Sequence, residues 1–241
     1  MAGLGRWLLS GLALALMPGP RAHGADWSFV LAPYAWGAGL DGQVRHAGLP
    51  PVASRRGGSD ALSSLDWAAM ASLQARRDRL VMFADVLHVQ LSESGTVPLA
   101  GVPARMRVRA STALLAGGYR LLEGPAGHLD LLAGVRAWQL SSRVAIGAPI
   151  DRGASAGVGW LDPQLGLKAR WSPGGRWFLS GWLLVDPDGG EADLMAAVGR
   201  EVGERTAVHL GYRHVSMKRR STRFSVDADV AGPGLGVEYR F

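Results

Sequence analysis

The final segment, GPGLGVEYRF (residues 232–241), alternates strictly between two kinds of side chain. Successive residues of a strand point to opposite faces, so this segment predicts a strand with one apolar face and one small or charged face. A barrel wall between lipid and an enclosed interior requires this pattern. The apolar face carries Pro233, Leu235, Val237, Tyr239 and Phe241; the other carries Gly232, Gly234, Gly236, Glu238 and Arg240.

Similar segments, separated by turn residues, fill the chain from Trp27 onward. We expect a single all-β domain over residues 25–241: one closed antiparallel transmembrane barrel of about ten strands, within a range of about 8–12. The predicted strands are 27–40, 65–76, 80–92, 105–121, 128–142, 158–171, 176–186, 191–202, 206–217 and 229–241.

Composition supports a barrel over other membrane or secreted folds. Of the 241 residues, 48% are hydrophobic and 19% charged, yet no run of about 18 apolar residues follows the N-terminus, which argues against a helical membrane protein. The absence of cysteine excludes disulfides, thiolate metal sites and a lipid-modified cysteine. We expect no metal and no cofactor.

Residues 1–24 are typical of a cleaved signal peptide. Arg6 supplies the positive charge, an apolar stretch follows from Trp7 to Met17, and small residues permit cleavage after Gly24 or Ala25. A chain exported in this way, and carrying this strand pattern, is expected in the outer membrane of a Gram-negative cell.

The connections between predicted strands alternate in length. The short ones are 77–79, 122–127, 172–175 and 203–205; the long ones are 41–64, 93–104, 143–157 and 218–228, with a short exception at 188–190. Outer-membrane barrels have short periplasmic turns and longer outer loops, so both ends of the mature chain are expected in the periplasm.

Charged residues at alternate strand positions are expected to face the barrel interior. An Arg or Lys facing lipid at the membrane midplane costs about 2–4 kcal/mol, which several strands could not tolerate. We therefore predict a mutually paired charge network in the lumen. Its acidic members are Asp66, Asp130, Asp162 and Glu238, and its basic members are Arg76, Arg136, Lys168, Arg170, Arg213 and Arg240.

Aromatic residues predict two girdles at headgroup depth. The expected periplasmic girdle contains Trp27, Trp171, Trp177, Phe178, Tyr239 and Phe241, and the expected outer girdle Trp36, Trp67 and Trp160.

The last strand also resembles the C-terminal signal by which the barrel-assembly machinery recognises outer-membrane proteins, through an exposed strand edge and alternate side chains. The resemblance rests on Leu235, Val237, Tyr239 and Phe241. Nearly the whole mature chain resembles a widespread, uncharacterised family of proteobacterial outer-membrane barrels, similar in size to OmpA-like, OmpW-like and porin-like proteins. The motifs are Pro33-Tyr34-Ala35-Trp36 with Leu40-Asp41-Gly42, Trp160-Leu161-Asp162-Pro163 with Gly166, Gly211-Tyr212-Arg213, and residues 232–236. They imply fold and location but no reaction.

One short motif resembles an enzyme. His214-Val215-Ser216, followed by Asp227 and Asp229, is similar to the His-x-Ser pair and downstream acid of lipid A deacylases. The roles would be His214 as base, Ser216 as nucleophile and Asp229 as the orienting acid. That family continues with Asn-Ala-Gly and uses Glu, whereas Met217-Lys218-Arg219 follows here. We expect no enzymatic activity, with this hydrolase as the alternative.

Basic residues in the predicted outer loops are candidates for contact with lipopolysaccharide phosphate, although ordinary solvated loops explain them equally well. The candidates are Arg55, Arg56, Lys218, Arg219 and Arg220. Outer-membrane lipid and the assembly machinery are the expected partners; nucleic acid is excluded by location, and the oligomeric state is open. The expected role is a narrow porin-like channel or a structural barrel, with a hydrolase, or an adhesion barrel acting through its outer loops, as alternatives.

Overall fold

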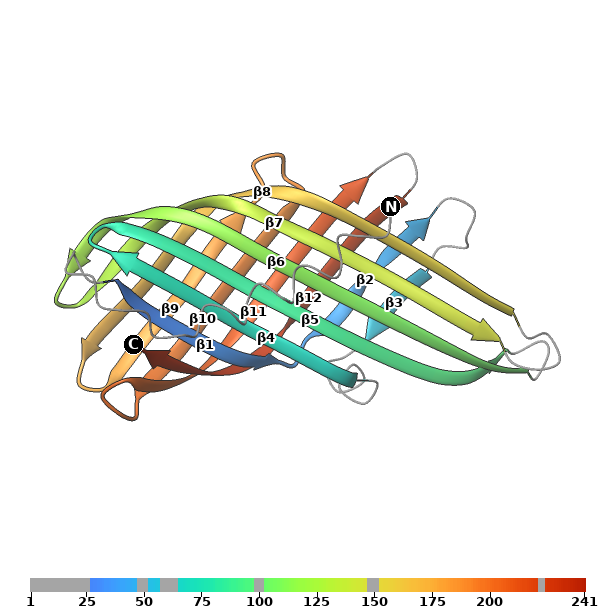
Figure 1. Ribbon diagram of the computed structural model, residues 1–241, viewed down its shortest axis with the longest axis horizontal. Helices are drawn as coiled ribbons and strands as arrows, with labels where there is room; N and C mark the ends of the chain where they lie inside the picture. The colour runs from blue at the N-terminus through green and yellow to red at the C-terminus, as the bar shows by residue number, and fades with distance from the viewer. Residues whose placement is uncertain (1–26, 47–51, 57–64, 98–101, 147–151, 221–223) are drawn as a thin grey trace.

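The computed structural model describes residues 27–46, 52–56, 65–97, 102–146, 152–220 and 224–241, which form a closed antiparallel β-barrel (Figure 1). The strand order is β1-β4-β5-β6-β7-β8-β9-β10-β11-β12, and pairing of β1 with β12 closes the ring. The predicted fold class is confirmed. Residues 1–24 lie outside the described residues, so the signal peptide stays a prediction.

Eleven of the twelve strand segments fill ten positions of the barrel wall, because β1 and β2 lie one after the other along β12. β3 is an additional strand that pairs with β2. The segments are β1 Ser28–Trp36, β2 Gly39–His46, β3 Val52–Arg56, β4 Leu65–Arg77, β5 Leu80–Val97, β6 Val102–Gly124, β7 Gly127–Ile146, β8 Arg152–Gly174, β9 Trp177–Val185, β10 Glu191–Glu201, β11 Thr206–Arg220 and β12 Phe224–Arg240.

Two features of the predicted strand map need correction. The first predicted strand, 27–40, is interrupted after Trp36, and the predicted loop 41–64 contains the rest of β2 and all of β3. The other long connections are largely strand: β5 continues to Val97, and β8 already begins at Arg152. Strand pairing can continue in water beyond the membrane, where charged and polar side chains suit either face, so polarity alone did not mark the strand ends.

The barrel has two distinct ends. The short turns that follow β4, β6, β8 and β10 lie at one end with the start of β1 and the end of β12; this is here called the turn end (Figure 1). β5 to β8 reach furthest toward the opposite, loop end (Figure 1). A tight turn connects β4 to β5, where Asp78 has a left-handed backbone with φ of 53°. Asp tolerates this conformation better than most residues.

The outer surface of the wall is apolar. Leu115, Leu161, Leu210 and Leu235 are each 57–65% exposed. A soluble monomer rarely exposes such a continuous apolar surface, so this belt fits contact with lipid. Among the described residues, no helix is long and apolar enough to cross a membrane.

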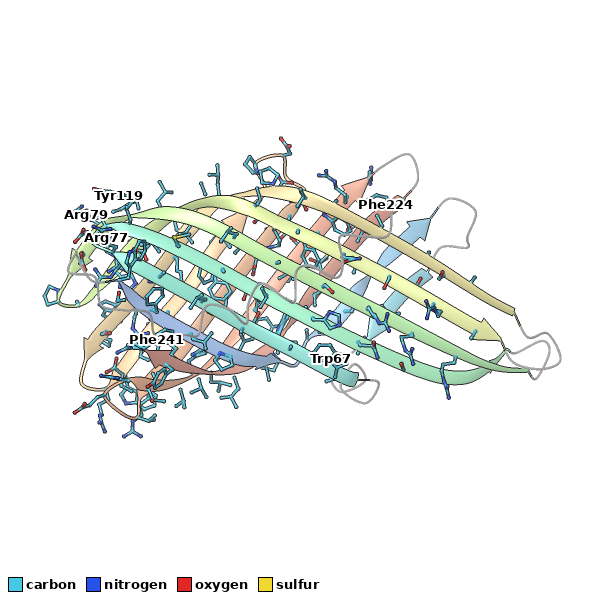
Figure 2. The ribbon with its side chains drawn as sticks, viewed as in Figure 1. Trp67, Arg77, Arg79, Tyr119, Phe224 and Phe241 are labelled. Carbon is cyan, nitrogen blue, oxygen red and sulfur yellow. The ribbon has the colours of Figure 1, made fainter. Side chains whose placement is uncertain are left out.

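The aromatic girdles are partly as predicted. At the turn end, Trp27, Trp171, Trp177, Tyr239 and Phe241 are 40–54% exposed, and at the other end Trp67 is 44% exposed (Figure 2). Three assignments were wrong. Phe178 is buried because even-numbered residues of β9 face the interior, and Trp36 and Trp160 pack against an interior cluster.

Candidate functional site

The centre of the barrel is occupied by the guanidinium of Arg213. Its Nη2 donates to Asp85 and Asp193, both at 2.8 Å, and its Nε donates to Asp193 at 3.0 Å. Its Nη1 donates to the hydroxyl of Tyr34 at 2.7 Å, and that hydroxyl donates to Asp85 at 2.9 Å. Every nitrogen of the guanidinium therefore has an acceptor.

A second buried arginine completes the group. Arg136 Nη1 donates to Glu191 at 2.6 Å, and its Nη2 donates to Asp193 at 2.5 Å. The indole nitrogen of Trp138 donates to the other carboxylate oxygen of Glu191 at 2.7 Å. Asp193 thus bridges the two arginines and joins their hydrogen bonds into one network.

This central network connects five strands across the lumen, and we define it as Tyr34 on β1, Asp85 on β5, Arg136 on β7, Glu191 and Asp193 on β10, and Arg213 on β11. The side chains of its two arginines and three carboxylates are at most 5% exposed. Buried charges cost several kcal/mol each to desolvate and are stable only when paired. Here each guanidinium nitrogen of the two arginines except Arg136 Nε has an acceptor within the described residues. The network therefore holds the walls together only while it stays complete.

An apolar cluster fills the lumen beyond the network, toward the loop end. Trp138, Val215, Met217, Val226 and Ala228 are buried there, and Trp160 stacks on Trp138 with ring centroids 5.9 Å apart. Trp160 also donates to Asp162 at 2.6 Å. The interior is thus obstructed twice, by charged groups at the centre and by aromatic packing above them.

On the other side of the network, a chamber of about 720 Å³ extends toward the turn end. Arg213 and Tyr34 line its inner end, and Arg205 and Phe241 line its outer end. Its wall includes Arg170, whose guanidinium lies 3.4 Å from the ring centroid of Phe178. Gly199 allows this arrangement, because a Cβ there would lie 2.0 Å from the Phe178 ring.

The predicted lumen charges all face the interior or its rim where their side chains are described, but most of their partners differ from the predicted ones. Arg170 pairs with Glu238 at 2.8 Å, as the prediction allowed. Asp130 pairs with Arg120 at 2.7 Å, and Asp162 lies 3.1 Å from Arg219.

Three other members of the prediction lie at the rim or are paired differently. Arg76 lies 3.4 Å from Glu123, and both side chains are partly exposed at the turn end. Arg240 lies 2.8 Å from Glu201 and 3.9 Å from the predicted member Glu238. Lys168 donates to Gln74. The side chain of Asp66 lies outside the described part of the chain.

Sequence reasoning missed Tyr34, Asp85, Glu191 and Asp193, the acceptors of the central network. A usable signal was present in Glu191-Ala192-Asp193-Leu194, where two carboxylates alternate with apolar residues. The signal for Asp85 was weaker, because the polar residues Asp85 and His88 fall on opposite faces of the same strand and alternation alone does not say which faces inward. The structure turns His88 outward, where its ring stacks on Trp67 with centroids 4.6 Å apart.

The candidates for lipopolysaccharide contact separate into three groups. Lys218 and Arg220 are exposed at the loop end, while the side chains of Arg55 and Arg56 are outside the described residues. Arg219 lies in β11 and not in a loop; odd-numbered residues of this strand face the interior, and its partly exposed guanidinium lies 3.1 Å from Asp162.

His214 and Asp229, the base and acid of the hydrolase alternative, are in contact on the outer face of the wall. His214 Nε2 lies 3.1 Å from Asp229 Oδ1, with the two side chains 45% and 55% exposed. Ser216 lies directly opposite Asp229 in the β11–β12 ladder. Within the described residues, the Ser216 hydroxyl makes no hydrogen bond to His214. Nor does that part of the chain contain a cluster of three His, Asp or Glu side chains able to hold a metal ion.

No protein-family model matches the chain, and no curated protein matches its sequence. Similar solved structures include the outer membrane protease OmpT from Escherichia coli, at a TM-score of 0.59 and 11% identity over 92% of this chain and 99% of that one. The chain has the fold of an outer-membrane β-barrel. Weaker likenesses are the translocator domain of autotransporter NalP from Neisseria meningitidis (TM-score 0.41, 15% identity, 91% and 90% covered) and Ail of Yersinia pestis (0.36, 10%, 90% and 100%).

Proposed function

We propose that this protein resides in the outer membrane as a closed barrel, with a structural or binding role and no open channel. The observation that carries the proposal is the central network, in which Arg136 and Arg213 share Asp193 across the lumen. The apolar outer belt supports the location, with the turn end facing the periplasm as in other barrels of this kind.

Passage of a solute would require the network to open. A permeating ion would have to separate buried Arg–carboxylate pairs, leaving uncompensated charges at a cost of about 3–5 kcal/mol for each broken pair. It would then meet the apolar cluster around Trp138 and Met217, whose hydrocarbon side chains cannot replace its hydration shell. Both obstacles favour a barrel that does not conduct ions.

We expect the purified protein to give no steady conductance steps in planar bilayers, because the network and the apolar cluster both block the lumen. Single-channel recording measures this directly. Insertion is verified on the same sample by faster gel migration of the unheated protein and by a general porin recorded under identical conditions. Reproducible ohmic steps from the verified protein would contradict the closed barrel and restore the narrow-channel interpretation.

A second candidate function, a lipid-directed acyl hydrolase, is favoured by the contact between His214 and Asp229. An acid within hydrogen-bond distance can orient a histidine and stabilise its protonated form. Ser216 shares the outer face of β11 with His214, at a Cα spacing of about 6.6–6.8 Å for residues two apart on a strand. The group faces the region where acyl chains of the outer leaflet would lie.

We nevertheless expect lipid A to be the same in cells producing the wild-type protein and in cells producing Ser216→Ala. The reason is that Ser216 has no hydrogen bond to His214 and so lacks the activation that a nucleophilic serine needs. Mass spectrometry of lipid A compares the two strains and a third producing His214→Ala. Loss of one acyl chain only with the wild type would identify the protein as a hydrolase.

A further inference from the structure

The chamber at the turn end has the properties of a ligand site. Its volume of about 720 Å³ lies within the range of about 300–1,000 Å³ typical of small-molecule pockets. Tyr34 and Arg213 of the central network line its inner end together with Trp36, and its outer end reaches exposed residues such as Arg205 and Phe241. A molecule can therefore enter from the periplasmic side and stop at the network.

The lining of the chamber is strongly basic. Seven arginine or lysine side chains line it, together with the carboxylates Glu201 and Glu238. Five of the seven cations are ion-paired, and within the described residues Lys168 and Arg205 have no ion pair. Both carboxylates are already paired with Arg170, at 3.3 and 2.8 Å. Low-dielectric walls concentrate the field of such charges, so the chamber attracts anions.

Deep in the chamber, Lys168 is the one lining cation without a carboxylate partner among the described residues. Its Nζ donates to the neutral side chain of Gln74, and within the described residues it has no ion pair. Asp130 is its direct neighbour across the β7–β8 ladder, but that carboxylate is turned to Arg120, at 2.7 Å. A cation with only an amide partner in a partly enclosed chamber is free to bind an incoming anion.

The surroundings of Lys168 are aromatic. Its Nζ lies 5.3 Å from the ring centroid of Phe83, and Phe83 lies 5.4 Å from Trp182, which faces Lys168 across the β8–β9 ladder. Both rings and Met195 line the chamber. Phe83 is 1% exposed and Trp182 7%, so the apolar surface that a ligand could reach here comes from the partly exposed Met195 and from the edge of Trp182. A fully hydrated inorganic ion would gain nothing from this surface, whereas an apolar ligand body would be desolvated against it.

We propose that the chamber binds a small organic carboxylate with an apolar body, whose carboxylate pairs with Lys168 while the body lies against Met195 and the edge of Trp182. Arg76, Arg205 and Arg240 near the opening steer such an anion inward. This binding role goes beyond the proposed closed barrel. A non-conducting barrel could lack the site and a conducting barrel could have it. Conductance and ligand binding are therefore tested by separate measurements.

The chain provides an internal control, because Lys168 and Lys218 are its only lysines. Lys168 lies in the chamber and Lys218 is exposed at the loop end. The purified barrel in nanodiscs is treated with a lysine-acylating reagent, with and without 3-phenylpropionate, and each site is quantified by mass spectrometry. At ten times the dissociation constant of the probe, we expect acylation of Lys168 to be about tenfold slower and that of Lys218 unchanged.

Two further probes and two variants define the ligand class. The neutral amide of the probe and inorganic phosphate are expected to give no protection of Lys168. Equilibrium dialysis of labelled 3-phenylpropionate should show at least tenfold weaker binding to Lys168→Met and unchanged binding to Lys218→Met. Equal protection of both lysines, protection by the amide, protection by phosphate alone, or unaltered binding to Lys168→Met would each overturn the proposal.

Discussion

Replacing Arg213 with Met is expected to lower the free energy of unfolding by about 3–5 kcal/mol. Arg213 pairs with both Asp85 and Asp193, whose side chains are at most 1% exposed. Removing it leaves Asp85 without a cation and leaves Asp193 with Arg136 alone. Breaking a buried ion pair from one side carries a penalty of that size. The measurement is the urea unfolding midpoint of the barrel refolded into lipid vesicles, followed by tryptophan fluorescence and by gel migration.

Arg240→Met is the matched control for this experiment. Arg240 also pairs with a carboxylate, Glu201, at 2.8 Å, but the two side chains are 35% and 36% exposed at the turn end. Solvent screens such a pair, so its loss should cost well under about 1 kcal/mol. Equal midpoints for Arg213→Met and the wild type would mean that water fills the centre of the barrel and that the network does not obstruct it.

Deleting Phe241 is expected to reduce assembled barrel in the outer membrane severely. Phe241 closes the seam between the first and last strands: its N–H donates to the Phe29 carbonyl at 3.0 Å, and it accepts from the Phe29 N–H at 2.9 Å. Its ring stacks on Phe29 with centroids 5.5 Å apart. Two hydrogen bonds and one aromatic contact together contribute about 2–4 kcal/mol to closure.

Quantification of heat-modifiable protein in outer-membrane fractions measures this loss. Phe29→Ala separates two causes, because it removes the ring contact at the seam while keeping the terminal Phe that the assembly machinery is proposed to recognise. If recognition of the last strand matters most, Phe29→Ala assembles well and the Phe241 deletion does not. Normal assembly of the deletion variant would argue against both the seam contact and the signal.

The strand pattern by itself determined the architecture. Alternation along residues 232–241 predicted the inward and outward faces of β12, and Glu238 is indeed buried while Leu235 is 60% exposed. Strand periodicity is local, because neighbouring side chains must point to opposite faces whatever the rest of the chain does. The inward direction of Asp130, Arg136, Asp162 and Arg213 followed from the same alternation, together with the cost of a charge in lipid.

The sequence did not determine which charges meet. Arg136 was expected to pair with Asp66, Asp130, Asp162 or Glu238, yet it binds Glu191 and Asp193, more than 50 residues away along the chain. Strand alternation specifies a face but not which residues of non-adjacent strands meet across the lumen. That depends on strand number, register and the closure of β1 on β12.

The same reason explains the remaining differences. Trp36, Trp160 and Phe178 have the composition of girdle residues, but their registers turn them inward, where they pack against the apolar cluster or under Arg170. The contact of His214 with Asp229 likewise required the β11–β12 register. The sequence determined the fold and the faces through local geometry. The obstruction of the lumen, and the placement of Lys168 against Gln74 rather than a carboxylate, were decided by contacts that form only when the barrel closes.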